Sequence, residues 1–110
     1  MYTYSFEKLD VWKLSRKLVK VIYTISSEFP DEEKFGLANQ IRRAAVSISS
    51  NLAEGTSRNS SKDKAHFSQI AYSSLMELLN QLIICVDLGY LIEKKLIGLR
   101  KQIDEIIRKK

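Results

Sequence analysis

A chain of 110 residues with 45% apolar residues, four glycines and one proline is long enough to bury a core and too apolar to be disordered. Its net charge of +5 is compatible with acidic partners, although such a balance is common among ordinary domains. The single cysteine excludes an internal disulfide, and the N-terminus lacks the charged start and apolar run of a signal peptide. No window approaches the roughly 20 consecutive apolar residues that span a bilayer. We therefore expect one cytoplasmic domain over residues 1–110 without a membrane partner.

The first predicted helix runs from about Lys8 to Glu28. Its apolar residues recur at helical spacing over a wide arc: Val11, Trp12, Leu14, Leu18, Val19, Val21, Ile22 and Ile25. Four basic residues, which we name the basic ridge, follow the i, i+3, i+4, i+7 spacing with no acidic residue between them. They are Lys13, Arg16, Lys17 and Lys20. Such a run is more often a solvated helix face than a site, and the alternative is a ridge that contacts phosphates.

The second helix is expected to begin at Pro30, which suits a first-turn position. Asp31, Glu32 and Glu33 follow it and complement the positive end of the helix dipole, so three successive acids need no anion-rich site to explain them. Gly55 is expected to end this helix as a left-handed cap.

Five polar side chains of the second helix fall at spacings of three, four, four and three residues, which places them on one face. They are Gln40, Arg43, Ser47, Asn51 and Glu54. Arg43 and Glu54 are too far apart on one helix to pair, and we expect Glu77 on the third helix to pair with Arg43. With Glu77, these six residues are named the polar seam. We expect the seam to fix helix register and subunit arrangement, because a buried ion pair contributes more to specific packing than to stability.

The third helix should start near Ser61, because Ser60 and Asp63 resemble a capping box, and should end at Gly89. Its apolar residues form two lines. One line contains Phe67, Ala71, Leu75, Leu78, Leu82 and Cys85, and the other contains Tyr72, Met76, Leu79, Ile83 and Val86. This surface is wider than two antiparallel neighbours require, so the helix is either central in the bundle or also buried against another subunit.

The last helix is predicted from about Glu93 to Arg108, with Leu96, Leu99, Ile103, Ile106 and Ile107 on its core side. Residues 91–110 carry seven Lys or Arg against three acidic residues, so most of the excess positive charge lies here. Four helices joined by short loops predict an all-α fold, an antiparallel up-down-up-down four-helix bundle.

No combination of residues predicts catalysis. His66 is the only histidine, and the chain lacks Glu-x-x-His pairs, glycine-rich phosphate loops, paired-cysteine motifs and nucleophile elbows. Cys85 lies in an apolar run and is interpreted as a small core residue. We therefore expect no enzymatic activity, no cofactor and no metal site.

Residues along nearly the whole chain follow a recognisable pattern, most specifically in the second helix. They are Phe6, Leu9 and Val11–Trp12; Phe29–Pro30, Glu33, Gly36–Leu37, Gln40–Ala44, Ser47, Asn51 and Glu54–Gly55; and Ser74, Glu77–Leu78 and Leu88–Leu91. This pattern resembles the four-helix-bundle family of 23S rRNA intervening-sequence proteins.

The resemblance implies an antiparallel four-helix subunit, a bacterial origin and a ring-like homo-oligomer, which we expect to be a pentamer. The family includes the accessory variability protein of diversity-generating retroelements, a basic barrel that binds nucleic acid and a reverse transcriptase. Many members are encoded outside both rRNA insertions and retroelements, and the "ribosomal protein" label given to some reflects genomic location.

The leading functional hypothesis is a non-enzymatic oligomer that binds RNA or DNA through phosphates. Its expected contacts are the basic ridge, Lys13, Arg16, Lys17 and Lys20, together with Lys94, Lys101 and Arg108. Binding of this kind is sequence-tolerant and steeply salt-dependent. The alternative is a protein-interaction scaffold without a nucleic-acid ligand.

Overall fold

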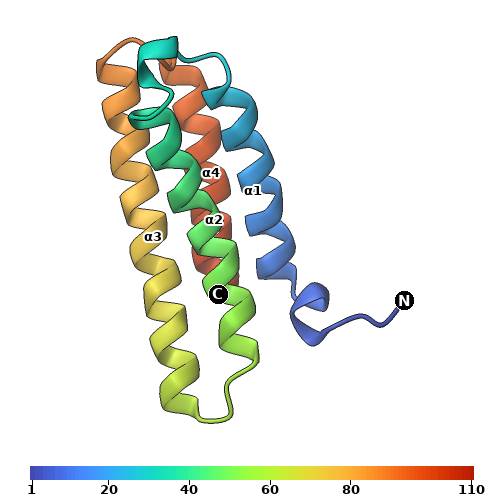
Figure 1. Ribbon diagram of the computed structural model, residues 1–110. Coiled ribbons are helices and arrows are strands. Elements are labelled where there is room, and N and C mark those ends of the chain that lie inside the picture. The colour runs from blue at the N-terminus through green and yellow to red at the C-terminus, as the bar shows by residue number, and fades with distance from the viewer.

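The computed structural model describes residues 1–110 as four α-helices and two short 3₁₀ turns (Figure 1). The helices are α1 (Asp10–Ser26), α2 (Leu37–Thr56), α3 (Ser61–Asp87) and α4 (Glu93–Lys109), and the turns are η1 (Ser5–Lys8) and η2 (Asp31–Glu33). Successive helices run antiparallel (Figure 1). α1 and α3 each pack against α2 and α4, whereas the backbones of the diagonal pairs lie farther apart. The predicted all-α, up-down-up-down four-helix bundle is confirmed.

All four helices contribute to one apolar core, and its fully buried side chains include Leu18, Ile22, Ile41, Ile48, Leu75, Leu78, Leu82, Leu99 and Ile106. Burying each such side chain contributes about 1.5–3 kcal/mol. The backbone of α3 comes close only to those of α2 and α4, so one of the two alternatives expected for α3, a central place in the bundle, is wrong. Its second apolar line is partly covered: Met76, Leu79 and Val86 are half-buried against the core, whereas Tyr72 and Ile83 are exposed.

The start of α2 differs from the prediction. Asp31–Glu33 form the separate turn η2, and α2 begins only at Leu37. The carboxylate of Glu33 reaches the new helix start, where its Oε1 accepts the backbone N–H of Leu37 at 3.1 Å. A Cβ atom on Gly36 would lie 2.5 Å from that oxygen, so glycine permits the approach. Glu33 therefore caps α2 from outside the helix.

The helix ends were predicted with mixed success. Ser60 Oγ accepts the backbone N–H of Asp63 at 3.1 Å, which confirms the expected start of α3. Gly89 adopts a φ of 81° after α3, and the backbone N–H of Tyr90 donates to Cys85 O at 2.9 Å, as in a Schellman motif. Gly55, in contrast, is not a left-handed cap, because it lies within α2 and Gly89 is the only glycine with positive φ. A Cβ atom on Gly55 would lie 3.3 Å from Phe67 Cβ, so the residue allows α2 and α3 to approach closely.

The α2–α3 hairpin extends beyond the ends of α1 and α4 (Figure 1). Lys110 Nζ donates to Ser68 O at 3.1 Å and to Ser68 Oγ at 2.8 Å, so the chain ends level with Ser68. None of residues 61–70 is buried.

α3 is the one helix whose length and mean hydropathy would allow it to cross a membrane. Core helices of water-soluble bundles meet the same two criteria, because one face of such a helix is apolar along its whole length. In this structure 39% of the apolar window of α3 is buried inside the bundle.

Candidate nucleic-acid interface

The seven residues predicted to contact nucleic acid are all exposed and lie on two neighbouring helices. Lys13, Arg16, Lys17 and Lys20 belong to α1, and Lys94, Lys101 and Arg108 belong to α4. α1 and α4 pack side by side and run antiparallel (Figure 1). We name the exposed Lys and Arg side chains of these two helices the basic face.

The basic ridge points to solvent because of the helix period. Positions two residues further along α1 include Ser15, Leu18 and Ile22, which are 1%, 0% and 0% exposed. With 3.6 residues per turn, a shift of two residues rotates a side chain by about 200° around the helix axis. Burial of this apolar stripe therefore turns the four basic residues outward.

A groove of about 720 Å³ lies between α1 and α4 and is bordered by three lysines, Lys20, Lys94 and Lys95. Its other lining residues are Val21, Thr24, Ile25, Ile92, Gly98, Leu99 and Gln102. Lys95 was not predicted as a site residue, because its place in the groove depends on how α4 is rotated against α1. The only available signal was its position beside Lys94.

The four helices differ sharply in their balance of charge. α1 and α4 together carry ten Lys or Arg and four Asp or Glu, whereas α2 and α3 together carry four of each. The structure places the two basic helices next to each other, so nearly all the excess positive charge lies on one side of the bundle.

Two members of the basic face have partners within the chain. Arg108 Nη2 lies 3.0 Å from Asp104 Oδ2, in a pair whose side chains are 72% and 60% exposed. The guanidinium carbon of Arg16 lies 5.5 Å from the ring centroid of Trp12, a cation–π arrangement that retains the positive charge. Lys13, Lys17 and Lys101 form no ion pair, so their charges are unneutralised within the chain.

The polar seam is only partly packed. Ser47 and Ser74 are joined by a hydrogen bond of 2.9 Å between their Oγ atoms, which links α2 to α3. Asn51 Nδ2 donates to Ser47 O at 2.8 Å and to Ser47 Oγ at 3.1 Å. Gln40, Arg43, Glu54 and Glu77 are instead exposed.

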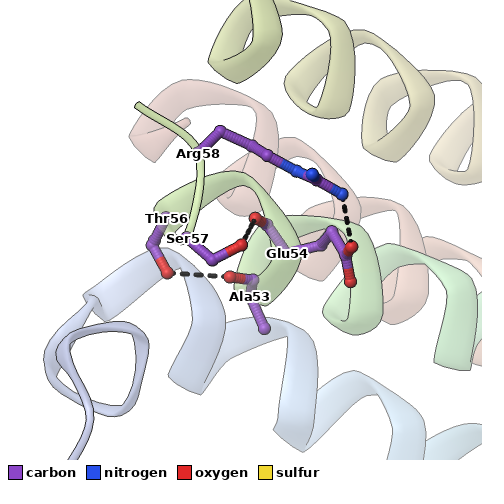
Figure 2. Close-up of polar contacts among 5 residues, drawn as sticks. All are labelled: Ala53, Glu54, Thr56, Ser57 and Arg58. Carbon is purple, nitrogen blue, oxygen red and sulfur yellow. Dashed lines mark hydrogen bonds and ion pairs between the residues drawn. The ribbon is translucent and has the colours of Figure 1, made fainter. Parts of the chain in front are cut away.

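The ion pair expected for the seam, between Arg43 and Glu77, does not form. The ion pairs of the chain are Arg58 with Glu54 and Arg108 with Asp104. Glu54 finds its partner one turn further on, where Arg58 Nη2 lies 2.6 Å from Glu54 Oε1 (Figure 2). Figure 2 also shows Thr56 and Ser57 donating to the carbonyl oxygens of Ala53 and Glu54, each at 2.7 Å. Glu54, the last residue of the polar seam, therefore forms its ion pair at the C-terminal end of α2.

The titratable groups near the α3–α4 turn have structural roles. Burial, reinforced by the negative charge of Glu33, raises the pKa of the Cys85 thiol to about 11. A thiol with that pKa is protonated at neutral pH and is a poor nucleophile. Tyr90 Oη donates to Glu33 Oε2 at 2.8 Å, and this hydrogen bond raises the pKa of Tyr90.

Side chains that could ligate a metal are scattered. No group of three or more His, Cys, Asp or Glu residues could hold one ion. His66 is exposed near the start of α3, with its ring centroid 5.5 Å from that of Phe67.

The chain is therefore a small helical-bundle protein, with four antiparallel helices, one basic side and one side without net charge. More narrowly, the family described as 23S rRNA-intervening sequence protein matches residues 7–109, and the chain belongs to this family. No curated protein matches the chain.

Proposed function

We propose that this protein is a non-enzymatic bacterial module of the cytoplasm that binds RNA or DNA non-specifically through phosphate groups. The observation that carries the proposal is the arrangement of α1 and α4, which are neighbours and hold ten basic residues against four acidic ones. α2 and α3 form the opposite side of the bundle and carry no net charge. Binding would therefore be oriented, with the α1–α4 side toward the nucleic acid.

The dimensions of the basic face suit a polyphosphate backbone. A helix of 17 residues such as α1 or α4 is about 25 Å long. Double-stranded DNA carries one charge per roughly 1.7 Å of its axis, so several phosphates fall within the length of the two helices. Lysine ammonium groups recognise phosphate as point charges and read no base, which fits binding without sequence preference.

Assembly into a homo-oligomer, which we propose to be a pentamer as the family resemblance implies, would multiply this effect. Linked copies of a weak site act at high effective concentration, so several basic faces on one ring bind more tightly than one. The exposed apolar residues Tyr72, Ile83 and Ile97 of α3 and α4 support a further contact between copies. If the relation to the retroelement accessory protein holds, a reverse transcriptase is a candidate protein partner.

The test compares charge reversal on opposite sides of the bundle. Wild-type protein is expected to retain duplex DNA and structured RNA in a gel at low salt, whereas Lys13→Glu/Lys17→Glu/Lys20→Glu is expected to abolish retention. The matched control is Arg43→Glu/Lys62→Glu/Lys64→Glu, which makes the same change of charge on exposed residues of α2 and α3. Absence of retention by the wild type would refute the proposal.

A protein-interaction scaffold is the second candidate, and the exposed apolar residues of α3 and α4 favour it. Met76, Leu79, Ile97 and Ile107 line a groove of about 470 Å³ between these helices. Under this hypothesis a defined partner protein would be recovered from nuclease-treated lysate, and its recovery would decrease in Ile97→Asp while the triple α1 variant would retain it.

A further inference from the structure

A pocket smaller than the two grooves described above lies on the α2–α3 side of the bundle, away from the basic face. Its volume is about 420 Å³. The lining residues are Asn39, Gln40, Arg43, Ala44, Ser47, Glu77 and Gln81. Four of these residues, Gln40, Arg43, Ser47 and Glu77, belong to the polar seam, so much of the seam surrounds an open pocket.

Opposite charges line this pocket without meeting. Arg43 and Glu77 are both exposed, and their charged atoms do not come within the 4.0 Å of an ion pair. Elsewhere on α2, an arginine and a glutamate within reach of each other do pair, as Arg58 and Glu54 show. The pocket therefore offers a guanidinium and a carboxylate that remain available to another molecule.

A buried polar side chain at the same pocket also lacks a partner. Gln81 is 8% exposed, and its Oε1 atom accepts no hydrogen bond. Leaving a buried acceptor unpaired is costly, and native proteins rarely do so. Gln81 lines the pocket, so a donor from a bound molecule can satisfy this acceptor when the side chain turns toward it.

We propose that this pocket binds a small zwitterion, namely a free α-amino acid. The carboxylate of the ligand pairs with the Arg43 guanidinium, whose fork of N–H donors matches two carboxylate oxygens. The ammonium group of the ligand donates to the Glu77 carboxylate and to Gln81 Oε1. Asn39 and Gln40 supply further carboxamide donors and acceptors at the rim.

The composition of the pocket argues against other small ligands. A simple anion would be repelled by Glu77, and a simple cation would be repelled by Arg43. A nucleobase needs an apolar or aromatic surface on which to stack, and Ala44 is the only apolar residue in the lining. A molecule that carries both charges a short distance apart fits these constraints.

The probes are the twenty common L-amino acids, each titrated into the full-length protein and followed by amide chemical shifts and thermal shift. At least one is expected to give saturable shifts confined to residues around the pocket at concentrations up to about 10 mM. The methyl ester and the N-acetyl derivative of that amino acid each lack one charge and are expected to bind at least about tenfold more weakly.

The variants Arg43→Gln and Glu77→Gln test the two charges separately. Each should weaken binding of the amino acid by about tenfold or more, and both residues are exposed, so the fold should be retained. Arg100→Gln and Glu105→Gln, on α4, are the matched controls and should bind normally. The proposal fails if no amino acid gives saturable shifts, or if neither pocket variant weakens them. It also fails if Arg43→Gln or Glu77→Gln changes the number of subunits measured by light scattering, since a second copy would then occupy the pocket.

Discussion

The α1–α4 side and the α2–α3 side of the bundle use charge in different ways. On α1 and α4, positive side chains outnumber negative ones by ten to four, and most remain unpaired on the surface. On α2 and α3 the numbers are equal, and polar groups such as Ser47 and Ser74 bond one helix to the other. The net charge of the whole chain therefore describes neither side. One side carries an excess of unpaired positive charge, and the other combines helix packing with a small polar pocket.

The salt dependence of nucleic-acid binding should show the largest difference between the two sides. If the basic face neutralises six or more phosphates, raising salt from about 50 to about 200 mM should weaken duplex DNA binding by roughly 10³-fold or more, because counterions are released on binding. Fluorescence anisotropy with a labelled duplex measures this dependence. A change of less than about threefold over the same range would mean that few phosphates are contacted.

Neutralising the groove lysines should reduce that salt dependence. Lys20→Gln/Lys94→Gln/Lys95→Gln is expected to flatten the slope of log K against log salt by about 0.9 for each phosphate that the variant no longer neutralises. The control Arg43→Gln/Lys62→Gln/Lys64→Gln removes three exposed charges from the other side and should leave the slope unchanged. An equal effect of the two variants would show that the sides do not differ in binding.

Removing the hydrogen bond between α2 and α3 should affect stability and not binding. Ser74→Ala deletes the partner of Ser47 Oγ at a position that is 8% exposed. The free energy of unfolding is expected to fall by about 0.5–1.5 kcal/mol, measured by urea denaturation. Ser73→Ala, at the exposed neighbouring position, is the control and should be nearly neutral. A loss of nucleic-acid affinity in Ser74→Ala would contradict the division between the sides.

Two basic residues of α4 should contribute unequally to binding. Lys101 forms no ion pair, whereas Arg108 pairs with Asp104 at 3.0 Å. Lys101→Ala should therefore weaken DNA binding more than Arg108→Ala, by a difference below about 1 kcal/mol, since exposed ion pairs are weak. Asp104→Asn should strengthen binding slightly by releasing Arg108, and unchanged affinity in that variant would mean that Arg108 does not contact phosphate.

The smallest expected effect corrects the interpretation made from sequence. Because Glu77 is exposed and unpaired, Glu77→Ala should change the free energy of unfolding by less than about 0.5 kcal/mol in the absence of amino acids. The predicted buried pair with Arg43 would instead have lowered the melting temperature. Differential scanning calorimetry distinguishes these two results.

The features predicted correctly from sequence are those that depend on neighbouring residues. The buried stripes follow from the 3.6-residue period, and the Ser60 cap and the Gly89 turn follow from contacts within six residues. The predicted start of α2 was wrong because the actual start depends on the Glu33 carboxylate. This carboxylate accepts hydrogen bonds from the backbone N–H of Leu37 and from Tyr90 Oη, which lies 57 positions away in the sequence. No local pattern reveals such a contact.

The candidate site was predicted less completely for a related reason. The outward direction of the basic ridge follows from the period of α1, whereas the place of Lys95 beside Lys20 depends on the rotation of α4 against α1. The expected pairing of Arg43 with Glu77 also required the distance between two helices, which spacing along the sequence does not give.

The projection of the α2–α3 hairpin beyond the other two helices has a consequence for how the bundle opens. Residues 61–70 have no buried member, and the hydrogen bonds of Lys110 to Ser68 anchor the chain end at that level. Segments with few buried contacts unfold locally at the lowest free energy. Amide hydrogens at the hairpin tip should therefore exchange first, while those at the end held by Glu33 and Tyr90 remain protected. Local unfolding of the bundle is thus expected to begin at the hairpin tip.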